Sequence, residues 1–161
     1  MRIYRLITLA ASALIFAACN PFHVGQAVQM SAQDVNLNAR WHGNIASPAT
    51  LAGAVQMTGE ATMAPGSNAG NTTVTLDVAN ATPGGRHPWA LHYGQCGDDR
   101  GIFGPQDAYK ALEVGGDGRA TASARVPLET PTTGSYFVSV QASAANADMT
   151  IACGNLAPPT Q

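Results

Sequence analysis

The chain has 161 residues, a formal net charge of −2 at neutral pH and a hydrophobic content of 45%. Lys110 is its single lysine, and the acidic balance excludes a nucleic-acid partner, because phosphate binding needs clustered Lys and Arg side chains. This length suits one domain with its own hydrophobic core.

The N-terminal segment predicts an export signal. Arg2 and Arg5 give it a positive start, and the apolar run over residues 6–18 is too short to span a bilayer. The run ends in Phe16-Ala17-Ala18-Cys19, which resembles the signal of bacterial lipoproteins, where the cysteine is acylated after cleavage. We therefore expect a signal peptide over residues 1–18, a lipid on Cys19 and a polar tether over residues 19–33. The alternative is an ordinary secretory signal cut near Ala18, with Cys19 as a free thiol.

The expected lipid makes the membrane the first predicted partner. By resemblance to the sorting rule of Gram-negative lipoproteins, Asn20 implies the outer membrane, with the domain facing the periplasm or the surface. Removal of Arg2 and Arg5 with the signal leaves six basic and ten acidic residues, a net charge of −4. The sequence identifies no protein partner.

Alternating apolar and polar residues then predict a series of short strands. They are expected over residues 35–42, 51–63, 72–79, 88–93, 120–126, 135–141 and 149–153, with the stretch over 51–63 weaker because it carries two glycines. Turns are expected at residues 65–68 and 82–85, a loop over 94–104 and a hairpin turn at 115–118. The pattern indicates an all-β sandwich or barrel over residues 34–156, followed by a disordered tail at 157–161. Trp41 and Trp89 are expected in its core.

The three cysteines predict one disulfide bond. With Cys19 carrying lipid, Cys96 and Cys153 remain, and two cysteines in an oxidising compartment are typical of a bonded pair. Such a bond would close a loop of about 57 residues, which chain entropy associates with roughly 4 kcal/mol.

Two short motifs resemble Cu,Zn superoxide dismutase. Thr82-Pro83-Gly84-Gly85-Arg86-His87-Pro88-Trp89-Ala90-Leu91-His92-Tyr93-Gly94-Gln95-Cys96 is similar to the family stretch in which a Pro-Gly turn leads into His-Gly-Phe-His-x-His and a cysteine. Ile151-Ala152-Cys153-Gly154 is similar to the C-terminal Ala-Cys-Gly, and Asp117-Gly118-Arg119-Ala120 to a family Asp-Gly-x-Ala. The resemblance covers roughly residues 50–156 and implies a Greek-key β-sandwich or barrel with a Cys96–Cys153 bond. An immunoglobulin-like sandwich is the alternative fold.

Most of the metal ligands that the resemblance implies are absent. Ala90 occupies the place of one copper histidine and His92 that of another, while His87 matches a structural position. The final copper histidine falls at Val140 or Gln141. No histidine occurs in residues 97–111, where the family carries its bridging and zinc histidines. Thr150 stands in place of the catalytic arginine.

His92 is therefore only a weak candidate for a metal ligand, since copper and zinc sites need several converging imidazoles. Strand parity predicts that His92 shares a face with Ala90 and points away from His87. We expect a surface or edge histidine whose replacement by alanine changes stability by less than ~0.5 kcal/mol. No bound cofactor is expected. The alternatives are a copper or zinc ion held by His92 with unplaced ligands, or copper held loosely by His23, His42 or methionines.

Other chemistry has weaker signals. Asp98, Asp99 and Asp107 could gather around a calcium ion, but an acidic solvated loop is the favoured interpretation. No Gly-x-Ser-x-Gly elbow occurs, so no motif indicates a serine hydrolase. The sequence thus predicts a lipid-anchored envelope protein with a dismutase-like domain, without dismutase activity, in a structural or binding role. A metal-binding protein or a degenerate dismutase is the alternative.

Overall fold

The computed structural model describes residues 40–51, 53, 54 and 56–160. They form an all-β domain, as the alternating pattern predicts. The strands are β1 (Trp41–Ala46), β2 (Thr58–Pro65), β3 (Thr72–Ala79), β4 (Arg86–His87), β5 (Trp89–Gln95), β6 (Asp98–Ile102), β7 (Leu112–Glu113), β8 (Ala120–Val126), β9 (Tyr136–Ser143) and β10 (Asn146–Leu156). Two single-turn 3₁₀ helices, η1 (Ala49–Leu51) and η2 (Gln106–Ala108), lie in the connections. The described part of the chain contains no helix that meets the length and hydrophobicity needed for a membrane span.

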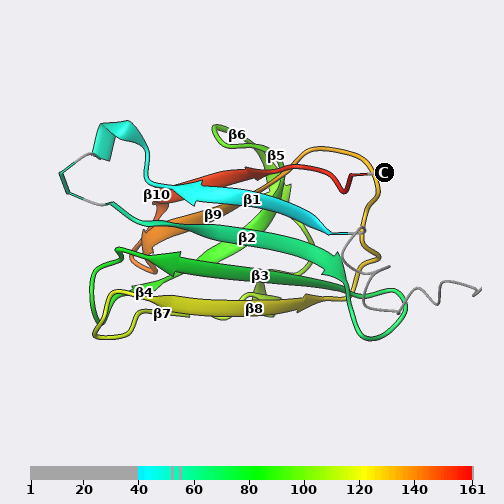
Figure 1. Ribbon diagram of the computed structural model, residues 1–161, viewed down its shortest axis with the longest axis horizontal. Helices are drawn as coiled ribbons and strands as arrows, with labels where there is room; N and C mark the ends of the chain where they lie inside the picture. Colours follow the sequence, from blue (N-terminus) through cyan, green and yellow to red (C-terminus); the bar gives the residue numbers. More distant parts are fainter. Residues whose placement is uncertain (1–39, 52, 55, 161) are drawn as a thin grey trace, which may run out of the picture.

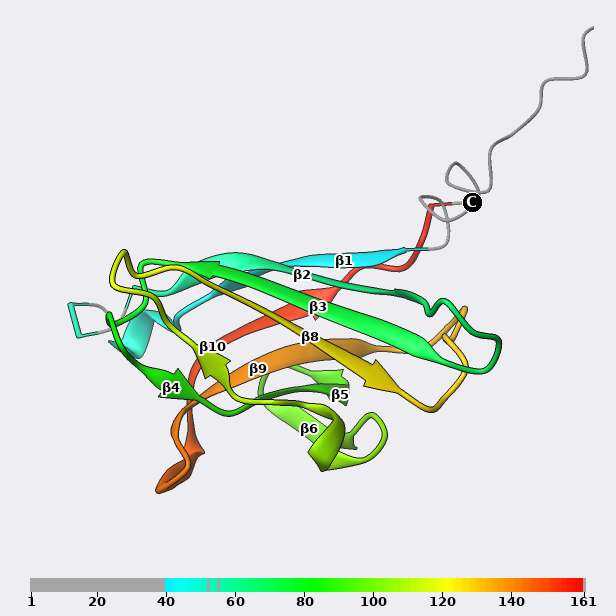
Figure 2. The same cartoon turned by 90° about the horizontal axis from the view of Figure 1, so that it is seen from below.

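Eight strands form one antiparallel sheet in the order β6-β5-β9-β10-β1-β2-β3-β8, and β4 pairs with β7 in a small second sheet. The large sheet curls into a half-barrel, so that β5, β6 and β9 lie opposite β2, β3 and β8 (Figures 1 and 2). Long connections place β8 beside β3 and β9 beside β5, which is the kind of return found in Greek-key sheets. The predicted class, an all-β sandwich or barrel, is confirmed.

The core fills the space inside the curl. Strand β3 alternates as predicted, with Val74, Leu76 and Val78 buried and facing the interior. Leu91 and Val138 face them from β5 and β9 and are fully buried. Because successive side chains of a strand point to opposite faces, the neighbours of Leu91 and Val138 project onto the outer face of β5 and β9. Trp41 and Trp89 are buried, as expected.

The structure corrects two expected connections. The loop expected over residues 94–104 contains β6, an edge strand paired only with β5. Its first four residues are exposed on both faces, so it carries no alternating signal, and the tight turn into it uses Gly97 at φ 89°. The turn at 115–118 is present, but β7 and β8 pair with β4 and β3 and not with each other. It therefore joins the two sheets.

The ends of the domain also differ from the sequence-based bounds. Of the strand expected over residues 35–42, only residues 40–42 are described, and β1 begins at Trp41 and continues to Ala46. The stretch expected over 51–63 is a strand only from Thr58. Ala157, expected to begin a disordered tail, exchanges backbone hydrogen bonds with His42.

Candidate functional site

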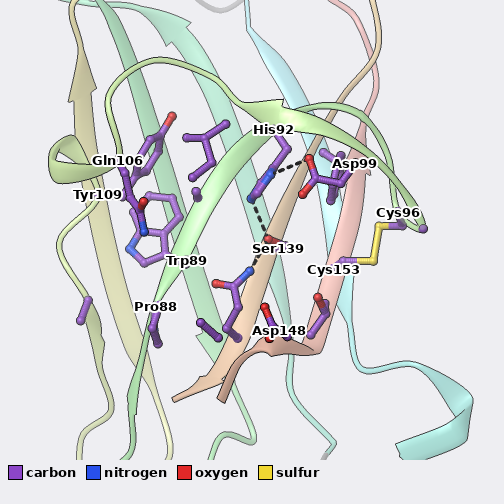
Figure 3. A pocket seen from close by; sticks show the side chains of 18 of the residues that line it. Pro88, Trp89, His92, Cys96, Asp99, Gln106, Tyr109, Ser139, Asp148 and Cys153 are labelled. Atoms are coloured by element: carbon purple, nitrogen blue, oxygen red, sulfur yellow. Dashed lines mark hydrogen bonds and ion pairs between the residues drawn. A yellow bond between two sulfur atoms is a disulfide. The ribbon is translucent and has the colours of Figure 1, made fainter. Parts of the chain in front are cut away.

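An open cleft of about 830 Å³ lies on the outer face of β5, β9 and β10 (Figure 3). The segment from β6 to β7 forms one wall, and the β9–β10 hairpin forms the other. The lining residues are Pro48, Pro88, Trp89, Ala90, His92, Cys96, Gly97, Asp99, Ile102, Gln106, Tyr109, Ala111, Phe137, Ser139, Gln141, Ala147, Asp148, Thr150 and Cys153.

His92 lies in the floor of this cleft and is only 6% exposed. Its Nδ1 lies 3.0 Å from Asp99 Oδ1, and its Nε2 lies 2.9 Å from Ser139 Oγ. The imidazole also stacks on the Phe137 ring, with centroids 5.0 Å apart and an interplanar angle of 26°. The expectation of a surface or edge histidine is therefore wrong, because β9 supplies both a stacking ring and a hydrogen-bond partner.

The hydrogen bonds run in one direction along a chain of four side chains. Gln141 Nε2 donates to Ser139 Oγ over 2.7 Å, so the serine hydroxyl proton is free to point at His92 Nε2. An ionised Asp99 can only accept, so a neutral His92 donates from Nδ1 and accepts at Nε2. The structure thus holds one tautomer of His92 with its basic nitrogen against a hydroxyl group.

Asp99 is suited to the role of acceptor at the end of this chain. Partial burial raises the pKa of its carboxyl group, but the bond from the Gly101 N–H and the contact with His92 outweigh burial and hold the pKa below its ordinary value. The carboxylate is therefore ionised at neutral pH and orients the imidazole.

Aromatic packing secures the wall nearest η2. Trp89 and Tyr109 meet edge to face with ring centroids 5.3 Å apart. Trp89 Nε1 donates to the Lys110 carbonyl over 2.7 Å, and the Tyr109 hydroxyl donates to the Phe103 carbonyl over 2.7 Å. Burial raises the pKa of Tyr109 above its ordinary range, so this hydroxyl stays neutral and structural.

The rim beside β10 is closed by a disulfide bond. Cys96 and Cys153 are bonded with their Cα atoms 6.1 Å apart, which confirms the predicted pair. The Cys96 N–H also donates to Asn155 Oδ1 over 2.8 Å. These two links hold the β5–β6 turn, and with it Asp99, against β10.

Some of the residues that the dismutase resemblance matches to metal ligands or to the catalytic arginine lie in the cleft, and others lie in the core. Ala90, Gln141 and Thr150 line the cleft, whereas Val140 is fully buried in the core. His87 is separate from His92: its Nδ1 lies 2.9 Å from the Ala142 carbonyl, and its Nε2 has no hydrogen-bond partner among the described residues.

Two further histidines that the structure describes, His42 and His87, lie away from the cleft. His42 is exposed on β1, and neither it nor His87 lines the cleft. Cys19 and His23 lie outside the described residues.

The donor set does not fit a copper–zinc pair. Within the part of the chain that the structure describes, no three His, Cys, Asp or Glu side chains are grouped to hold a metal. Both nitrogens of His92 are already hydrogen-bonded, and Asp98 pairs with Arg100 over 2.8 Å. Asp98, Asp99 and Asp107 are likewise not grouped around one point in the described structure, and Asp107 is exposed.

The charge of the cleft is negative. Among the described lining residues there is no Lys or Arg, while Asp99 and Asp148 contribute two carboxylates. An anion entering the cleft therefore meets no compensating positive charge.

A comparison with known protein families and with curated proteins found no match to the chain. The relation to superoxide dismutase is accordingly a resemblance carried by the motifs around His92 and Cys153.

Sequence reasoning missed the polar partners of His92. Asp99 was interpreted as part of an acidic loop, and Gln141 only as a position lacking histidine. Ser139 was not singled out. One available signal is the parity of β9, in which Phe137, Ser139 and Gln141 alternate with the apolar Val138 and Val140.

Proposed function

We propose that this chain is a lipid-anchored envelope protein whose dismutase-like domain binds a small uncharged or cationic organic ligand in the cleft and does not dismute superoxide. One observation carries the proposal. The cleft combines aromatic walls and a hydrogen-bonding floor with a single imidazole, and no Lys or Arg lines it among the described residues.

The composition of the cleft suits ligand binding. Small-molecule sites are concave, mostly apolar, and carry a few polar groups that orient the ligand. Here the lining includes the aromatic residues Trp89, Tyr109 and Phe137, which are 3%, 8% and 4% exposed, and the hydroxyl and amide groups of Ser139 and Gln141. A volume of about 830 Å³ is within the range of organic ligand sites.

The same lining residues do not provide the ligands or the charge that superoxide dismutation needs. Redox cycling by copper requires several imidazoles at defined positions, whereas His92 is the only histidine among the described lining residues. Superoxide is an anion, and its entry would be opposed by Asp99 and Asp148. Thr150 lines the cleft where the resemblance implies the arginine that would attract it.

The first test measures metal and activity together. Purified protein is incubated with copper and zinc, dialysed against a chelator, and assayed for metal content and dismutase activity. We expect no stoichiometric metal and no activity above that of free ions, and the same result for Thr150→Arg. Copper that survives dialysis and is lost in His92→Ala would contradict the proposal and favour a metal-binding protein.

The second test measures binding, with the uncharged dye Nile red as the probe. We expect saturable fluorescence enhancement at one site. Ala147 is an exposed lining residue, so Ala147→Trp should fill part of the cleft and weaken binding at least about 10-fold. Ala69→Trp, in the exposed β2–β3 turn, is the matched control and should leave binding unchanged. Equal binding by both variants, or no binding by the parent protein, would refute a ligand-binding cleft.

A further inference from the structure

We propose that the Asp99–His92–Ser139 chain is a nucleophilic site that hydrolyses small uncharged carboxylic esters through an acyl-Ser139 intermediate. This inference rests on the proposed function, because the substrate must first bind in the cleft.

The geometry satisfies the requirements for an activated serine. The base must lie within hydrogen-bond reach of the nucleophile, and a third group must orient the base. His92 Nε2 lies 2.9 Å from Ser139 Oγ, and Asp99 Oδ1 lies 3.0 Å from Nδ1 on the other side of the ring. Figure 3 shows the two interactions on opposite sides of the imidazole.

The other bond to Ser139 fits proton transfer from Ser139 to His92. Gln141 Nε2 is a donor, so Ser139 Oγ accepts from it and offers its own proton to His92. Packing favours this orientation of the imidazole, because the ring is stacked on Phe137 and His92 is 6% exposed.

The three side chains lie on three neighbouring strands of the sheet. Ala90 on β5 pairs with Ser139 on β9, and His92 pairs with Phe137. On the other side of β5, His92 pairs with Ile102 of β6, the strand that carries Asp99. Sites built on paired strands keep catalytic groups in place better than sites on free loops. Ser139 therefore does not need the strained elbow of the Gly-x-Ser-x-Gly motif.

A donor for the developing oxyanion is available beside the nucleophile. The Gln141 amide lies 2.7 Å from Ser139 Oγ and can transfer its hydrogen bond to the carbonyl oxygen of a bound ester. Side-chain amides serve this role where they meet the oxygen that gains negative charge.

The reaction balances without a cofactor. Ser139 Oγ attacks the carbonyl carbon while its proton passes to His92 Nε2, which forms a tetrahedral intermediate with the negative charge on the former carbonyl oxygen. Collapse breaks the bond between carbon and the alcohol oxygen, and His92 returns the proton to the leaving alcohol. Water then attacks acyl-Ser139, gives one proton to His92, and releases the carboxylic acid as that proton returns to Ser139.

The substrate class follows from the lining. Carboxylates at Asp99 and Asp148, without a described basic lining residue, disfavour anionic esters. The aromatic walls favour an apolar acyl or alcohol group next to Ser139.

The experiment uses an uncharged fluorophosphonate, which modifies activated serines, followed by intact-mass measurement and peptide mapping. We expect one phosphonyl adduct, located on Ser139, and its loss in Ser139→Ala. Hydrolysis of p-nitrophenyl acetate should be lost in the same variant. Because the Asp99 side chain is 54% exposed, Asp99→Asn should fold normally and slow labelling at least about 100-fold.

Asp98→Asn is the matched control, since Asp98 lies on the same strand but pairs with Arg100 and not with His92. It should be labelled at the parental rate. An adduct on another residue, or equal labelling of both Asp variants, would overturn the inference. Absence of any adduct in a protein that still binds Nile red would overturn the esterase and leave the binding cleft intact, whereas loss of Nile red binding in the parent would refute the proposed function itself.

Discussion

Replacement of His92 by alanine tests whether the cleft floor is a structural unit. The change removes two side-chain hydrogen bonds and one stacked ring contact. A hydrogen bond contributes about 0.5–1.5 kcal/mol net, and an aromatic pair about 0.5–1.5 kcal/mol. Since the cleft is open, water can reach Ser139 and Asp99 after the substitution and offset part of the loss. We therefore expect the free energy of unfolding to fall by about 2 kcal/mol.

For a domain of this size, that loss corresponds to a decrease in Tm of roughly 6–12 °C. The assay is urea or thermal unfolding of the purified protein, followed by circular dichroism. His42→Ala is the control, because His42 is exposed on β1, and it should change stability by less than about 0.5 kcal/mol. Equal, small effects of the two substitutions would show that the bonds to Asp99 and Ser139 do not stabilise the domain, and would restore the surface interpretation of His92.

Three further predictions concern the disulfide bond, the acid response and the anchor. Replacing Cys96 and Cys153 by serine should lower the free energy of unfolding by about 2–5 kcal/mol in denaturant titrations, and an unchanged midpoint would contradict a stabilising bond. The pKa of Asp99 is lower in the folded protein than its ordinary value of 3.8, so the unfolded chain binds more protons and this contribution to stability is lost as the pH falls below that value. The free energy of unfolding of Asp99→Asn should therefore fall less steeply at acid pH than that of the parent protein. An equal fall in the two proteins would contradict this prediction. Cys19→Ala should abolish lipid labelling and release the protein to the soluble envelope fraction, whereas unchanged labelling and membrane retention would defeat the anchor.

Local patterns predicted the strands that have one buried and one exposed face. Residues 72–79 and 120–126 alternate because their inner side chains enter the core, and the structure confirms both strands. The same reasoning failed at β6, because an edge strand with exposed residues on both faces has no alternating pattern to detect. The number of cysteines, with Cys19 expected to carry lipid, predicted the Cys96–Cys153 bond that the structure contains.

The chemistry around His92 depended on tertiary structure. The sequence determined the number of histidines and the face of β5 that His92 occupies, and these are enough to remove most of the implied metal ligands. It could not show that Ser139, 47 residues away, meets His92 Nε2, because that contact depends on the register between β5 and β9, in which Leu91 and Val138 are both buried. A shift of one residue in that register would turn Ser139 into the core. Strand periodicity assigns a side chain to a face, but only the packed sheet decides which polar groups meet there.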